Sequence, residues 1–212
     1  LHRIAENGYK AAYVCFDPPP AAHEWYMELF RRLDGAALPI GLIFEAYVPH
    51  GEEFWRAMTR AFAADRSLAA FSPDTESEES RMRIRRYSYA NAALEQELAC
   101  LKGIGLQTGL YFSVVPGEGV DQARRTTAWI GDLADRFGSL SWAHAIDIEP
   151  FSDWARDPER WGLRNTRRGL DEYLAWHRAP RDPDAGGCEV GYEMDGFAEV
   201  AAILKACERR GT

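Results

Sequence analysis

Acidic residues stand at the ends of several apolar runs in this sequence. The run from Ala11 to Phe16 is followed by Asp17 and then three prolines. Proline has a fixed φ and no backbone N–H to donate to a neighbouring strand, so the strand must end there. Later runs end at or near Glu45, Asp74 and Glu149. Taken singly, each acid is as well explained as a cap of the following helix. Gathered at one place, they would suit an ammonium group and the hydroxyls of a ribose.

Basic residues crowd the segment that follows the third apolar run. The stretch "FSPDTESEESRMRIRRYSYAN" couples an acidic, hydroxyl-rich turn to four arginines: Arg81, Arg83, Arg85 and Arg86. One interpretation is a solvated helix with pairs such as Glu79–Arg83. The other is a site for a ligand with both amine and carboxylate groups, because a guanidinium fork fits a carboxylate. The sequence leaves both open.

Histidines and cysteines give weaker signals. No two histidines are spaced as a metal-binding pair, and the four cysteines lie far apart without a CxxC or CxxxC pair. We therefore predict no metal ligands on this chain and reduced cysteines in a cytoplasmic protein. His144 is either an active-site base or a core histidine with its hydrogen bonds satisfied.

Strand and helix patterns alternate along the chain. Apolar runs within 11–20, 37–49, 67–74, 106–118 and 142–150 alternate with helical patterns at 21–35, 51–65, 91–105, 121–139 and 164–178. Five strand-then-helix units in a row predict an α/β fold with parallel strands and right-handed crossovers. We expect a partial TIM-type (βα) barrel. A doubly wound open sheet is the alternative, although no glycine-rich phosphate fingerprint follows the first run.

Helical spacing also predicts which side chains face the core. In the second helical pattern these are Phe54, Ala57, Met58, Ala61 and Phe62, and in the third they are Leu94, Leu98 and Leu101. In the first pattern, Trp25, Leu29 and Leu33 have helical spacing. If the strands are parallel, their carboxyl ends meet at one rim, and residues that are distant in sequence converge there.

Composition limits the partners and the domain organisation. The 212 residues are 46% hydrophobic and carry a formal charge of −8, which argues against a nucleic-acid or anionic-membrane surface. No apolar run approaches the roughly 20 residues of a membrane span, and no secretory leader is recognisable. We predict a barrel domain over 1–179, then a linker and a tail of uncertain fold over 180–212. The opening "LHRIAENGYK" has the pattern of a helix ending at Gly8, which suggests a piece of a longer protein.

The ordered set of segments resembles one known family. The segments "FDPPP", "PIGLIFEAYVP", "FSPDTESEESRMRIRRYSYAN", "YFSVVPGE" and "IDIEPFSDWARDPERWGL" are similar to the radical S-adenosylmethionine (SAM) superfamily, and most of all to members with a cobalamin-binding domain ahead of the barrel. The resemblance covers roughly Gly8 to His177. It implies a truncated (βα)6 barrel that begins at the family's second strand.

The resemblance implies a role for each motif. The end of the family's second strand contacts the SAM amino group, the fourth-strand motif contacts ribose and carboxylate with an arginine partner, the fifth-strand motif contacts adenine, and the sixth closes the pocket. Carried to this sequence, the implied cofactor-binding residues are Phe16, Asp17, Pro18, Glu45, Ser72, Asp74, Glu76, Arg81, Arg85, Arg86, Ser113 and Glu149.

One defining feature of the family is missing from this sequence. A CxxxCxxC triad normally holds the 4Fe-4S cluster, and none is present. We therefore expect a fragment that begins just downstream of that triad. The intact enzyme would need SAM, the cluster, a reductant and, in this group, cobalamin. It would make a 5′-deoxyadenosyl radical that acts on a small-molecule or peptide substrate, often leading to methylation, and the fragment alone would be inactive.

Two other classes remain open on the residues alone. Glu45 and Glu149 would serve as acid and base in a glycosidase, or as cation ligands in a metal-dependent lyase. A non-catalytic domain could also keep the barrel for interactions only.

Overall fold

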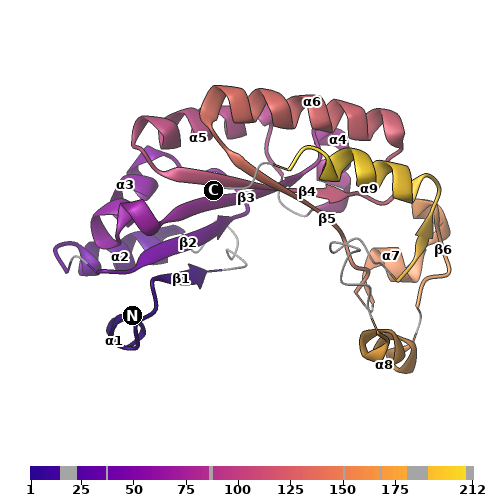
Figure 1. The fold of residues 1–212 in the computed structure, drawn as a ribbon, viewed down its shortest axis with the longest axis horizontal. Helices are drawn as coiled ribbons and strands as arrows, with labels where there is room; N and C mark the ends of the chain where they lie inside the picture. Colours follow the sequence, from indigo (N-terminus) through magenta and orange to yellow (C-terminus); the bar gives the residue numbers. More distant parts are fainter. Residues whose placement is uncertain are drawn as a thin grey trace.

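The chain is built on one five-stranded parallel sheet. The computed structural model describes residues 1–14, 23–36, 38–85, 88–149, 151–167, 169–180 and 191–208. In sheet order the strands are β1 (Ala11–Val14), β2 (Gly41–Ala46), β3 (Leu68–Asp74), β4 (Gln107–Val114) and β5 (Leu140–Ala145) (Figure 1). Every pairing is parallel, so the predicted α/β class is confirmed.

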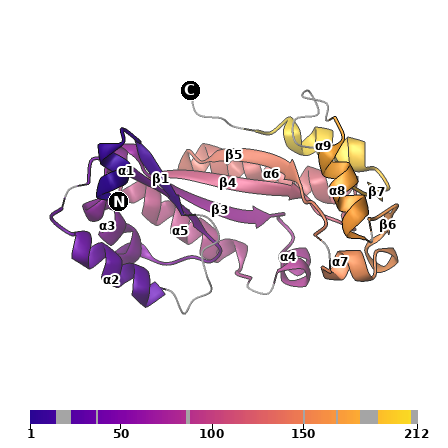
Figure 2. The ribbon, with the colours of Figure 1, turned by 90° about the horizontal axis from the view of Figure 1, so that it is seen from below.

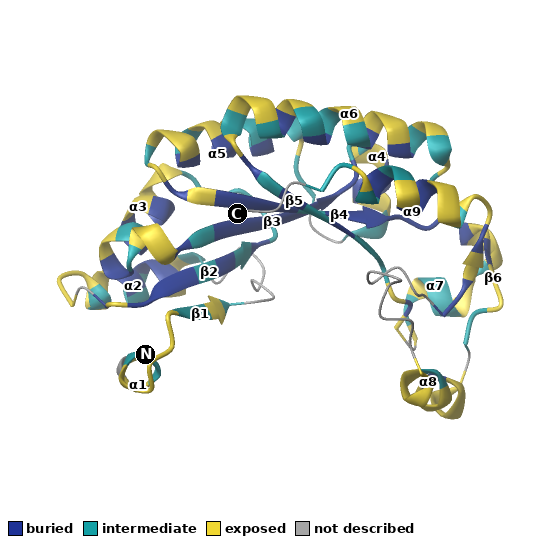
Figure 3. Cartoon of the chain, in the orientation of Figure 1, coloured by how far each residue is buried: buried dark blue, intermediate teal, exposed yellow. Residues whose placement is uncertain are grey.

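Four helices cover one face of this sheet. They are α2 (His23–Leu33), α3 (Glu52–Ala61), α5 (Asn91–Gly103) and α6 (Val120–Phe137) (Figure 1). Successive side chains of a strand point to opposite faces, and Phe44, Phe71 and Phe112 point into this helix layer, where they are buried. Figure 3 shows the central strands buried and the outer sides of the helices exposed. The main hydrophobic core therefore lies between the sheet and these helices.

The predicted core faces of α3 and α5 are confirmed, whereas that of α2 is wrong in part. Trp25 is 62% exposed, and α2 instead buries Tyr26, Met27 and Phe30. Tyr26 and Phe30 make edge-to-face contacts with Phe44 and Phe54. This aromatic cluster rotates the helix away from the face that spacing alone suggests.

The opposite face of the sheet is left open across its middle. Figures 1 and 2 place α1 (His2–Glu6) near one end of this face, and α7 (Asp153–Arg156) and α8 (Leu170–Arg178) near the other. Among the described residues, β1 pairs only with β2, and β5 only with β4, so no closed barrel forms. The architecture is a partial barrel with a concave face.

The strand that carries His144 is shorter than expected. It ends at Ala145 and not at Glu149.

Short helical elements connect the strands and helices of the described residues. The short helix α4 (Glu78–Ile84) follows β3, and 3₁₀ turns lie at η2 (Ala64–Arg66) and η3 (Glu159–Trp161). The helix expected over 164–178 begins only at Leu170.

The C-terminal part of the chain returns to the sheet. Strands β6 (Leu163–Arg164) and β7 (Glu193–Met194) form an antiparallel pair. Helix α9 (Phe197–Lys205) then packs against α6, β4 and β5 and buries Val200 and Leu204. The division of the chain at residue 179 stays a prediction. Within the described ranges, no helix combines the length and apolar composition that crossing a bilayer requires.

Candidate functional site

A pocket occupies the concave face of the sheet. Its volume is about 540 Å³, which is within the usual size range of small-molecule sites. Its lining comes from all five strands of the sheet, from the end of α9, and from the residues that follow β2, α4 (Glu78–Ile84) and α9. It consists of Tyr13, Glu45, Tyr47, Ser72, Arg85, Tyr111, Trp142, Ala143, His144, Lys205 and Glu208. Ligands of parallel α/β folds bind beyond the carboxyl ends of the strands, and several of these residues lie there.

Asp74 anchors the arginine of this pocket. The residue ends β3 with φ of +61°, a conformation that Asp tolerates better than most residues, next to a shift in the β3–β4 register. Its buried carboxylate pairs with Nε of Arg85. The Arg85 guanidinium also lies over the Tyr47 ring, 5.5 Å from its centroid. Burial lowers the pKa of Arg85, but the Asp74 carboxylate more than reverses this and leaves the pKa raised.

A hydrogen-bonded chain runs from Asp74 to His144. Ser113 Oγ donates to Asp74 Oδ1 at 2.8 Å and lies 3.2 Å from His144 Nε2. Ser113 and His144 are register partners on β4 and β5, which explains their contact. Asp74 and Ser113 are buried behind the pocket wall, whereas Arg85 and His144 line the pocket. The two buried residues therefore position the two that a ligand can touch.

Glu45 links three strands on the concave face. It accepts hydrogen bonds from the Tyr13 hydroxyl at 2.7 Å and from Ser72 Oγ at 3.2 Å. Burial, and then the Glu45 carboxylate, raise the pKa of Tyr111. This part of the pocket offers carboxylate and hydroxyl oxygens, which suit an ammonium group or sugar hydroxyls.

The β4–β5 side of the pocket is aromatic. The rings of Tyr111 and Trp142 stack with centroids 5.1 Å apart. The Trp142 indole lies over Gly109, where a Cβ would approach Cζ3 to 2.5 Å. A residue without a side chain is therefore needed under the indole.

Lys205 and Glu208 reach the pocket from the C-terminal segment. Glu208 Oε1 accepts the Ala143 N–H at 3.1 Å and the Lys205 ammonium at 3.0 Å. Sequence reasoning missed both residues. In the sequence, these two residues show only the three-residue spacing of a salt bridge near the end of a helix. Nothing in the sequence predicts that they contact β5.

Arg81 does not line the pocket. It is completely buried, and its guanidinium donates to the carbonyls of Pro73, Thr75 and Tyr89 and to Asn91 Oδ1. Four of its five N–H donors are therefore satisfied inside the loop. Arg81 holds the β3–α5 connection in shape.

Glu76 lies in a separate polar cluster at the start of α6. Gln122 Nε2 donates to its carboxylate at 3.1 Å. Nearby, Thr75 Oγ1 donates to Glu118 at 3.0 Å, and burial raises the pKa of Glu118. This cluster joins the β3–α4 loop to α6, and Glu76 is not among the residues lining the concave pocket.

The remaining sequence-predicted residues are not brought to the pocket by the described structure. Glu149 is exposed, four residues beyond β5, and no described contact joins it to Glu45. The carboxylate pair expected for a glycosidase or lyase therefore has no support. Phe16, Asp17, Pro18 and Arg86 lie outside the described residues.

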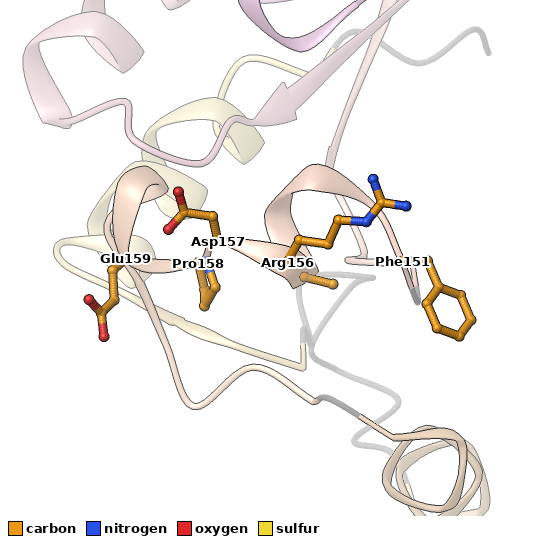
Figure 4. Close-up of a pocket in the computed structure, with 6 residues that line it drawn as sticks. Phe151, Arg156, Asp157, Pro158 and Glu159 are labelled. Carbon is orange, nitrogen blue, oxygen red and sulfur yellow. The ribbon is translucent and has the colours of Figure 1, made fainter.

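A second hollow, of about 360 Å³, follows β5 (Figure 4). Its lining includes Phe151, Arg156, Asp157 and Glu159. Figure 4 shows the charged side chains pointing in different directions, and Phe151 is 80% exposed. This hollow gathers no set of groups that converge on one ligand.

The residues present do not fit an iron–sulfur cluster. The sequence has no CxxxCxxC triad, and within the described ranges no three His, Cys, Asp or Glu side chains are placed to hold a metal ion. The Glu45 carboxylate, the Arg85 guanidinium and the Ser72 hydroxyl of the concave pocket are chemically suited to the ammonium, carboxylate and hydroxyl groups of SAM.

Comparison with known proteins defines the class of fold. The partial parallel barrel is similar in fold to solved structures of TsrM, a radical SAM methyltransferase from Kitasatospora setae. TsrM with cobalamin and a [4Fe-4S] cluster matches with a TM-score of 0.66 and 13% identity, over 98% of this chain and 44% of TsrM. TsrM with tryptophan and the SAM analogue aza-SAM matches with a TM-score of 0.53 and 16% identity, over 68% and 28%.

This chain thus spans less than half the length of the structures it matches. No family model matches the chain, and no curated protein does. At this level of identity the likeness shows the fold alone.

Proposed function

We propose that this chain is the SAM-binding part of a radical SAM enzyme, one whose reaction is a cobalamin-dependent methylation. The observation that carries the proposal is the convergence of Glu45, Ser72 and Arg85 on the concave face of a radical SAM-like fold. In support of the finer class, the solved structures that share the fold are of a methyltransferase with cobalamin, a [4Fe-4S] cluster or a SAM analogue bound.

The pocket has a complementary group for each part of SAM. Arg85 would hold the aminoacyl carboxylate, because Asp74 fixes its Nε and leaves both terminal amino groups without a hydrogen bond to any described residue. Glu45 would accept the ammonium group, and Ser72 a ribose hydroxyl. The Tyr47 ring, beside Arg85, would lie near the adenine.

The share of this chain in the chemistry would be binding and orientation. When bound beside a reduced cluster, SAM would be the source of the radical. The radical chemistry would be carried out by the cofactors. The cluster ligands would lie outside this chain, so the 212 residues alone would be inactive.

Calorimetric titration of the 212-residue chain with SAM tests the proposal. We expect one saturable site. Arg85→Gln should weaken binding at least about ten-fold, since hydrogen bonds to charged groups contribute about 1.5–3 kcal/mol. Arg60→Gln is the matched control, because Arg60 is exposed on α3 and pairs with Asp34 at 3.3 Å. Absence of saturable binding, or equal losses in both variants, would refute the proposal.

Reconstitution with iron and sulfide tests where the cluster ligands lie. We expect no stable cluster absorbance on the 212-residue chain, and a CxxxCxxC triad within a few tens of residues upstream of Leu1 in the coding sequence. A stoichiometric cluster on this chain would contradict the assignment.

A further inference from the structure

The hydrogen bonds of Ser113 determine where the proton of His144 lies. The Asp74 carboxylate is paired with Arg85 and can only accept, so Ser113 gives it its single hydroxyl proton. In the 3.2 Å hydrogen bond between Ser113 Oγ and His144, the donor must then be Nε2–H and the acceptor Ser113 Oγ. A neutral His144 therefore carries its proton on Nε2 and a lone pair on Nδ1.

The lone pair on Nδ1 has no partner among the described residues. Nδ1 makes no hydrogen bond to any described residue. It is also not a fully buried atom. The His144 side chain lines the concave pocket. A side chain that lines the pocket thus carries an acceptor that no described residue occupies.

Several charged groups surround this imidazole. Burial lowers the pKa of His144. The Asp74 and Glu45 carboxylates raise this pKa, and the Arg85 and Lys205 cations lower it further. Glu208 and the Tyr111 phenol also face the pocket. The balance favours the neutral, accepting form of His144 near neutral pH.

The surroundings of His144 indicate the shape of its ligand. The Tyr111 ring meets the imidazole edge-on with centroids 6.2 Å apart, and Trp142 stacks on Tyr111. Flat aromatic surface beside a fixed acceptor favours a planar molecule with a hydrogen-bond donor.

We infer that the β4–β5 side of the pocket takes a planar ligand bearing an N–H or O–H group, and that Nδ1 of His144 accepts its hydrogen bond. Ser113, held by Asp74, is the positioning residue that fixes the tautomer. The inference rests on the proposed function, because it assigns the substrate half of the pocket whose Glu45–Arg85 half would hold SAM.

The tautomer can be read without SAM. Long-range ¹H–¹⁵N spectra of the labelled chain distinguish the two ring nitrogens, and His144→Gln identifies the His144 signals among those of the five histidines. We expect the Nε2–H form in the wild type and in Ser113→Thr, which keeps a hydroxyl. Ser113→Ala should give a mixture of tautomers. An Nδ1–H form in the wild type, or an unchanged tautomer in Ser113→Ala, would overturn the inference.

Phenol and its methyl ether, anisole, probe the ligand side. Phenol should move the Nδ1 resonance away from its pyridine-type position, and anisole should not. In His144→Phe, phenol should bind about five-fold more weakly, the effect of one neutral hydrogen bond, while anisole is unaffected. No phenol response at saturation, or equal responses to both probes, would contradict the assignment.

The two proposals can fail separately. An Nε2–H tautomer with a phenol response but no SAM binding would refute the proposed function alone. SAM binding with an Nδ1–H tautomer would refute this inference alone.

Discussion

The carboxylate of Glu97 on α5 accepts a hydrogen bond from the indole Nε1 of Trp55 on α3, inside the helix layer. The same carboxylate accepts the backbone N–H groups of His50 at 2.8 Å and Gly51 at 2.9 Å. It therefore ties the loop that follows β2, and hence the strand end that carries Glu45, to a helix more than forty residues further along the chain.

Replacing Glu97 should destabilise the fold strongly. Glu97→Ala leaves three donors without their acceptor, and each buried unsatisfied donor costs about 1–3 kcal/mol. We expect a loss of about 3 kcal/mol in the free energy of unfolding by urea denaturation. Glu53→Ala, on the exposed side of α3, should change it by less than about 0.5 kcal/mol. A loss below about 1 kcal/mol for Glu97→Ala would contradict the described network.

Adding a methyl group at Gly109 should displace Trp142. The added Cβ would lie 2.5 Å from Cζ3 and 3.0 Å from Cη2 of the indole. Overpacking of this kind costs about 1–3 kcal/mol. We expect Gly109→Ala to lower stability by that amount and to change the near-ultraviolet circular dichroism. The control is Gly131→Ala on α6, where an added Cβ meets nothing within 4 Å. An unchanged aromatic spectrum in Gly109→Ala would show that the indole does not lie over β4.

Removing the Tyr89 hydroxyl should not destabilise the protein. This buried oxygen has no hydrogen-bond partner among the described residues, and burial raises the pKa of Tyr89 to about 12. Tyr89→Phe should be neutral or stabilising by up to about 1 kcal/mol near pH 7.

The advantage of Tyr89→Phe should grow at alkaline pH. The unfolded phenol ionises near its ordinary pKa of 10.0, whereas the folded one resists ionisation until about 12. The stability that the neutral phenol contributes is present below pH 10 and is lost as the pH rises toward 12. Urea midpoints of both proteins at pH 7.5 and 10.5 measure this difference. A loss above about 1 kcal/mol in Tyr89→Phe at pH 7.5 would mean that the hydroxyl has a partner.

Acid should destabilise the wild type more than a variant without His144. Burial lowers the pKa of His144 below its ordinary 6.5, with Asp74 opposing this effect. As the pH falls below 6.5, the unfolded chain binds the proton first, so stability is lost until the folded imidazole is also protonated. Between pH 7.5 and 5, the free energy of unfolding should fall more for the wild type than for His144→Gln. Equal falls in the two proteins would show that the imidazole is not desolvated.

Regular patterns in the sequence predict much of this structure. Leu94, Leu98 and Leu101 are buried as their spacing indicates, and parallel strands do bring Glu45, Ser72 and Asp74 to one region. These successes rest on local periodicity and on the single direction of the strands.

Other features depend on contacts that no local pattern encodes. The face of α2 was decided by the aromatic partners Phe44 and Phe54, and not by the spacing of Trp25. The Ala143–Glu208 hydrogen bond spans 65 residues. Whether an arginine is a buried brace, like Arg81, or a pocket residue, like Arg85, depends on the course of its loop.

Chemical-shift mapping of the ¹⁵N-labelled chain with SAM tests the central claim most directly. The account predicts saturable shifts concentrated on the concave face, at Glu45, Ser72 and Arg85, with α5 and α6 little affected. Shifts confined to the helix-covered face, or none at saturating SAM, would contradict it.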